Sequence, residues 1–206
     1  MRSSLAFLVA TTILLAASGC GGTKRGSEAP PASAGTSSGT TNAVVGTGAT
    51  TATDPLPGAG TVPVVVNPTA TETALLTRVD VGAHAGYERV VFAFQKDLTG
   101  YDVRYVEPPI YEDGSGALVK IAGNAVLLVR LEPASGFDFS GEGHQVYKGS
   151  RRIEGGDVGT SLVREVVRSG DFEGVTTWAI GLDHRVPFLV RTLDDPTRLV
   201  VDLRSS

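Results

Sequence analysis

The chain has 206 residues, a formal net charge of −4 and a pI near 5.4, a balance that argues against general nucleic-acid binding. Its single cysteine excludes an intrachain disulfide, so packing and backbone hydrogen bonds must hold the fold. Apart from Phe7, every aromatic residue lies at or after Tyr87, and a segment without large side chains cannot bury much core. We therefore expect one folded domain that begins near Leu75.

The first twenty residues have the layout of a secretory signal with a lipid-attachment site. Arg2 gives a basic start, and Leu5–Ala17 is an apolar run without a charge. This run is shorter than the ~20 residues that a membrane-spanning helix needs. The sequence AASGC, which ends at Cys20, resembles a bacterial lipobox. We expect residues 1–19 to be a lipoprotein signal peptide and Cys20 to carry the lipid, a palmitate-type anchor on the outer side of a cell membrane.

Residues 20–74 are low in complexity. They are dominated by Gly, Pro, Thr, Ser and Ala and contain no aromatic residue. Such a segment cannot offset its ordering entropy by burial, and we expect it to be a disordered tether. Its one apolar cluster, Val62–Val66, contains Pro63 and is followed by Pro68, which argues against a strand.

From Leu75 onward, apolar and polar residues alternate in short runs that are separated by turns, a pattern typical of β-strands. In Arg89–Gln95, for example, Val90, Phe92 and Phe94 share one face. The other expected strands are 75–81, 101–106, 118–121, 125–131, 162–168, 175–182, 188–193 and 198–203. No segment has the pattern of an amphipathic helix. We therefore expect residues 75–206 to be all-β, folded as an antiparallel β-sandwich, with 132–152 as a functional or covering loop.

The sequence offers little sign of catalytic or cofactor chemistry. It contains no nucleophile elbow, Walker A or dinucleotide-binding pattern. The three histidines, His84, His144 and His184, lack the spacing of paired metal ligands. We expect no cofactor, no metal site and no catalytic residues.

The candidate binding residues are Asp171, Glu173 and Trp178. Trp178 is the only tryptophan, and our first expectation is that it packs in the core. The alternative is that it forms a sugar-stacking platform on the sheet, flanked by the two carboxylates.

Two segments of the expected domain resemble a known family. Asp195–Leu203 (DPTRLVVDL) resembles the terminal strand of AMIN domains, and Arg89–Phe94 (RVVFAF) resembles their opening hairpin. Gly170–Gly174 (GDFEG) and Trp178–Leu182 (WAIGL) are similar to stretches of the AMIN-like domain of actinobacterial lipoproteins. The resemblance covers about residues 75–204. It implies a non-catalytic β-sandwich that binds peptidoglycan, and we expect a stand-alone module because no amidase-like segment accompanies it.

These observations favour a lipid-anchored, non-catalytic module of the cell envelope that binds peptidoglycan or a wall-associated protein. Two alternatives stay open. One is a small envelope hydrolase that uses loop carboxylates, either Asp171 with Glu173 or Asp194 with Asp195. The other is a carrier of a small apolar ligand, which would need a cavity between the sheets.

Overall fold

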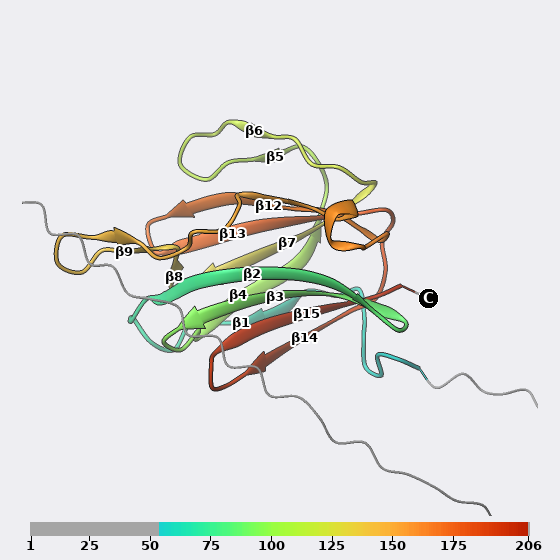
Figure 1. Ribbon diagram of the computed structural model, residues 1–206, viewed down its shortest axis with the longest axis horizontal. Helices are drawn as coiled ribbons and strands as arrows, with labels where there is room; N and C mark the ends of the chain where they lie inside the picture. The colour runs from blue at the N-terminus through green and yellow to red at the C-terminus, as the bar shows by residue number, and fades with distance from the viewer. Residues whose placement is uncertain (1–53, 206) are drawn as a thin grey trace, which may run out of the picture. The chain divides into compact units, whose positions relative to one another are not determined.

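The computed structural model describes residues 54–205, which form two packed β-sheets and a hairpin on the outer face of one of them (Figure 1). The expected all-β, largely antiparallel architecture is confirmed. The one helical element in this range is a 3-10 helix at Gly156–Val158, and no helix there is long and apolar enough to cross a bilayer. The expected signal peptide, Cys20 and most of the tether lie outside the described residues.

The larger sheet has six strands in the order β1-β4-β7-β13-β12-β11, all antiparallel. We call it the six-stranded sheet. Its strands are β1 (Val64–Val66), β4 (Gly100–Val106), β7 (Ala125–Glu132), β13 (Val175–Leu182), β12 (Val163–Phe172) and β11 (Arg152–Glu154).

The five-stranded sheet has the order β14-β15-β3-β2-β8. Its strands are β14 (Phe188–Leu193), β15 (Arg198–Arg204), β3 (Tyr87–Gln95), β2 (Ala74–His84) and β8 (Ala134–Ser135). Only the β2–β8 pair is parallel. Two short hairpins form separate two-stranded sheets. One pairs β5 (Ile110–Tyr111) with β6 (Leu118–Val119), and the other pairs β9 (Phe137–Asp138) with β10 (His144–Gln145).

The core fills the space between the two sheets. Val90, Phe92 and Phe94 on β3 are all buried, as their alternation predicts. Trp178 on β13 has no exposed surface, and its ring meets the edge of Phe92 at a centroid distance of 5.9 Å and that of Tyr147 at 5.5 Å. Burial of large aromatic rings is among the strongest contributions to a core. Trp178 therefore packs in the core, as we first expected.

Residues 54–73, which the sequence assigns to the disordered tether, instead pack against the sandwich. Leu56 is 3% exposed, and Gly60 exchanges two backbone hydrogen bonds with Phe188. Val64–Val66 forms β1 at the edge of the six-stranded sheet. Prolines close to this strand do not prevent it, because they lie outside its three residues and an edge strand pairs on one side only. The folded part of the chain thus begins about twenty residues earlier than Leu75.

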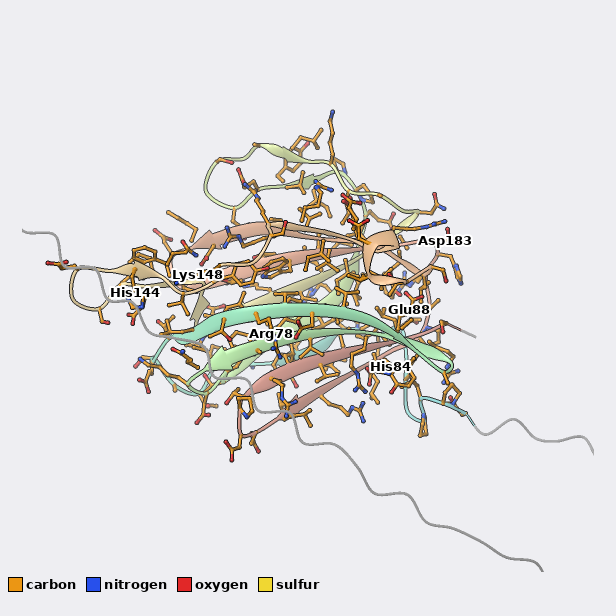
Figure 2. All side chains as sticks on the ribbon, in the orientation of Figure 1. Arg78, His84, Glu88, His144, Lys148 and Asp183 are labelled. Atoms are coloured by element: carbon orange, nitrogen blue, oxygen red, sulfur yellow. The ribbon has the colours of Figure 1, made fainter. Side chains whose placement is uncertain are left out.

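The buried carboxylate of Glu88 connects the two sheets. Glu88 lies on β3, is 3% exposed, and accepts hydrogen bonds from the backbone N–H groups of Ser161 (2.8 Å), Leu162 (3.1 Å) and Val163 (2.7 Å), where β12 begins (Figure 2). A buried charge is tolerated only when such donors surround it. In a fold without a disulfide, this contact fixes the end of one sheet to the other.

We predict that Glu88→Ala lowers the free energy of unfolding by about 2–4 kcal/mol, because three buried N–H groups lose their acceptor. Urea denaturation followed by Trp178 fluorescence measures the change. The matched control is Glu142→Ala in the exposed loop between β9 and β10, which should change the free energy by less than about 0.5 kcal/mol. Equal stabilities of the two variants would contradict this role for Glu88.

A second prediction concerns alkaline pH. Burial raises the pKa of Tyr105 and of Tyr147 above the ordinary value, which is about 10. As pH rises, the unfolded chain therefore loses these protons first, so stability is full below about pH 10 and falls as pH rises through the folded pKa values. We expect the urea midpoint to fall between pH 9 and pH 11.

The contribution of one buried tyrosine can be isolated by substitution. Tyr147→Phe should lose less stability than the wild type between pH 9 and pH 11. Tyr111→Phe, at an exposed tyrosine, should lose as much as the wild type. A wild-type midpoint that does not change over this range would refute the prediction.

Candidate functional site

Between β4 and β7 the chain leaves the six-stranded sheet and returns across its outer face (Figure 1). We call residues 107–124, which include β5 and β6, the covering hairpin. Ile110 of this segment packs with Val126 of β7 and Ala179 of β13 in a small apolar cluster outside the main core. The covering hairpin therefore gives the sandwich a partial third layer.

Two glycines allow the covering hairpin to approach the sheet closely. A Cβ atom at Gly181 would overlap the carbonyl oxygen of Ala122, and a Cβ at Gly170 would overlap the side chain of Asp113. With both glycines in place, the Asp113 carboxylate accepts a hydrogen bond of 2.6 Å from the Thr177 hydroxyl. Bare backbone on β12 and β13 thus determines where the covering hairpin sits.

An open hollow of about 430 Å³ lies between the covering hairpin and strands β11 and β12. Its volume is within the range typical of ligand sites. Because cationic side chains outnumber carboxylates on its walls, we call it the cationic hollow. It is lined by Glu112, Ala117, Leu118, Val119, Lys120, Arg151, Arg152 and Val167.

The two arginines of the cationic hollow are held in place by carboxylates. Arg151 forms an ion pair with Glu112 of the covering hairpin. Arg152 pairs with Glu165, whose side chain is 3% exposed, and also donates to the carbonyl of Lys120 at 2.8 Å. These contacts fix both guanidinium groups and join the covering hairpin to the edge of the sheet. A guanidinium held in this way has further N–H donors, in a planar fork that suits carboxylates and phosphates.

A smaller hollow of about 210 Å³ adjoins the first. It shares Glu112 and Arg151 with the cationic hollow, so this ion pair stands between the two. We call it the acidic hollow, because carboxylates outnumber guanidinium groups on its walls. It is lined by Glu112, Asp113, Arg151, Arg168, Gly170 and Asp171.

The structure separates the three binding residues that the sequence suggests. Asp171 lines the acidic hollow, where it accepts hydrogen bonds from the Ser135 hydroxyl (2.9 Å) and the Thr176 hydroxyl (3.0 Å). Glu173 is exposed in the turn between β12 and β13. Trp178 is 0% exposed and cannot stack on a ligand. The sugar-stacking alternative is therefore corrected: the ring lies between the sheets, packed against Phe92 and Tyr147.

The other polar candidates do not converge. His84 and His144 lie at opposite ends of the sandwich (Figure 2), while His184 contacts Asp183 at 3.4 Å. Within residues 54–205, no group of three His, Cys, Asp or Glu side chains is arranged to hold a metal ion. Asp194 and Asp195 lie in the exposed turn between β14 and β15.

Sequence reasoning missed the residues that form the cationic hollow. Glu112 and Arg151 are 39 positions apart, and no periodicity connects two segments at that separation. One signal was readable: Arg151 and Arg152 are adjacent in the sequence, at the end of the loop that was expected to be functional. Guanidinium groups suit carboxylates and phosphates.

We predict that Gly181→Ala displaces the covering hairpin and costs about 1–3 kcal/mol through overpacking. Trypsin cleavage after Lys120, which lies in this segment, should become several-fold faster, while the near-UV circular dichroism of the buried Trp178 is retained. Gly82→Ala is the control, because a Cβ there meets nothing within 4 Å.

Gly170→Ala provides a milder version of the same test, since the new Cβ meets the carboxylate and the Cβ of Asp113 rather than a backbone carbonyl. Its cleavage rate should lie between those of the wild type and Gly181→Ala. Wild-type rates in both variants would show that the glycines do not position the covering hairpin.

A family model described as the AMIN-like domain matches residues 74–205. The match begins at the first residue of β2 and extends past the end of β15, so it includes the five-stranded sheet, the covering hairpin and both hollows. No curated protein and no solved structure matched the chain. Because the family match spans well over half of the sequence, the chain belongs to the AMIN-like domain family.

Proposed function

We propose that the protein is a lipid-anchored, non-catalytic module of the cell envelope that binds peptidoglycan or a wall-associated partner. Membership of the AMIN-like family supplies the envelope context and the expectation of a binding module. The single observation that carries the proposal is the pair of adjoining hollows under the covering hairpin. Carboxylates fix the arginines there, and their remaining N–H donors suit an anionic group.

The proposed anchor is Cys20, through the lipobox-like sequence before it. Asp54, the first described residue, forms an ion pair of 2.8 Å with Arg204 at the end of β15. The 33 residues between Cys20 and Asp54 would reach at most about 110 Å from the membrane when fully extended. In Figure 1 the covering hairpin lies on the opposite side of the sandwich from the start of the described chain. This arrangement favours hollows that face away from the membrane.

The two alternative functions have less support. A hydrolase would need two carboxylates that face one site. Asp171 lines the acidic hollow, whereas Glu173 is exposed in the turn between β12 and β13. Asp194 and Asp195 lie in an exposed turn and line neither hollow. A carrier of an apolar ligand would need space between the sheets, where the rings of Trp178 and Phe92 are packed instead.

The test is co-sedimentation of the soluble chain, residues 21–206, with isolated cell walls across a salt series. We expect retention at low salt and a loss of several-fold between 50 and 500 mM salt, because partly exposed ionic contacts are screened. Lys120→Glu in the cationic hollow should weaken retention. Lys148 is exposed and lines neither hollow. Walls should therefore retain a larger fraction of Lys148→Glu than of Lys120→Glu.

One surface feature needs its own control. Phe139 of the β9–β10 hairpin is 74% exposed and could adhere to walls without specificity. Phe139→Ser should therefore sediment like the wild type. If neither walls nor solubilised envelope proteins retain the wild-type chain, the proposed function is wrong.

A further inference from the structure

We infer that the two hollows together recognise a short peptide that carries both a free carboxylate and a free ammonium group, rather than a sugar chain. This inference rests on the proposed function and specifies the chemistry of the ligand. It is carried by the charge arrangement of two adjoining hollows that share one ion pair.

The two hollows have opposite charge balances. The cationic hollow presents Lys120, Arg151 and Arg152 against the single carboxylate of Glu112. The buried Glu165 behind Arg152 raises the count to two carboxylates, and the cations still exceed them by one. A carboxylate is therefore favoured in this hollow, where planar guanidinium forks match its geometry.

The acidic hollow has the reverse balance. Arg151 and Arg168 face the three carboxylates of Glu112, Asp113 and Asp171. An ammonium group is favoured here, because it has donors for carboxylate oxygens and compensates the excess negative charge. A ligand that places one charge in each hollow matches both at once.

The shared ion pair gives the site a mechanism of exchange. Glu112 and Arg151 pair with each other, with side chains that are 23% and 53% exposed. A ligand carboxylate can replace Glu112 at Arg151, while the ligand ammonium group satisfies the freed Glu112. One internal ion pair is thus exchanged for two with the ligand, and neither side chain is left unpaired.

The uncharged walls also suit a peptide. Ala117, Leu118, Val119 and Val167 line the cationic hollow and offer contact to methyl and methylene groups. None of the residues that line either hollow is aromatic, so neither hollow offers a ring on which a sugar could stack.

The test measures binding by isothermal titration calorimetry with the soluble chain, residues 21–206. The probe is the tripeptide Nα-acetyl-Lys-D-Ala-D-Ala, which has one ammonium and one carboxylate group. Two matched analogues each remove one charge: the C-terminal amide and the Nε-acetyl form. The sugar probe is a peptide-free tetramer of N-acetylglucosamine. We expect the tripeptide to bind about 10-fold more tightly than the amide and several-fold more tightly than the Nε-acetyl form, and the sugar not to bind.

Substitutions in each hollow test which of them recognises the carboxylate and which recognises the ammonium group. In Glu112→Gln the ammonium group loses its partner, so the preference for the tripeptide over its Nε-acetyl form should fall to less than about twofold. Lys120→Gln should weaken the tripeptide several-fold and the amide less. Lys148→Gln should match the wild type. Because Glu112 and Lys120 are surface residues, circular dichroism can verify that each variant is folded.

The outcomes separate this inference from the proposed function. If walls retain the chain but the sugar tetramer binds and the tripeptide does not, the inference fails and the wall-binding module stands. The inference also fails if walls retain the chain and neither probe binds, or if Glu112→Gln leaves the preference for the ammonium group unchanged. Loss of both wall retention and envelope partners overturns the proposed function itself.

Discussion

The approach of the Ala122 carbonyl to the bare backbone of Gly181 is the constraint on which the site depends. It places the returning arm of the covering hairpin directly on β13. In that position the carbonyl of Lys120 can accept from Arg152, and Glu112 can pair with Arg151. A side chain at position 181 would lift the covering hairpin from the sheet. The positions of the two hollows and of the shared ion pair thus depend on this contact, together with that of Asp113 over Gly170.

The sandwich beneath the site is held by interactions that do not involve the covering hairpin. Phe92 and Trp178 pack between the sheets, and Glu88 ties β3 to the start of β12. On the outer face of the five-stranded sheet, the fully buried carboxylate of Asp202 pairs with two arginines. The two hollows thus lie in a surface layer on a framework that is held by contacts outside that layer.

Much of the fold could be predicted from the sequence because apolar and polar residues alternate within each strand. Val90, Phe92 and Phe94 identify β3 and its inward face directly. The strand at Val64–Val66 was missed because its partner, β4, lies more than thirty residues away and nearby prolines suggested a loop. Trp178 was placed by alternation on one face, but alternation does not say which face looks inward. The hollows could not be foreseen, because Glu112 and Arg151 meet only through tertiary packing.

The most direct test of the central claim, that the wall ligand binds under the covering hairpin, is ¹H–¹⁵N NMR mapping with solubilised peptidoglycan fragments. The soluble chain is titrated with the fragments, and the amide shifts are mapped onto the fold. This account predicts shifts concentrated in residues 112–120, at Arg151, Arg152 and Val167, and at Arg168, Gly170 and Asp171 of the acidic hollow, with few in β14 and β15. Shifts confined to the exposed β9–β10 hairpin around Phe139, or to the edge strand β1, would contradict it.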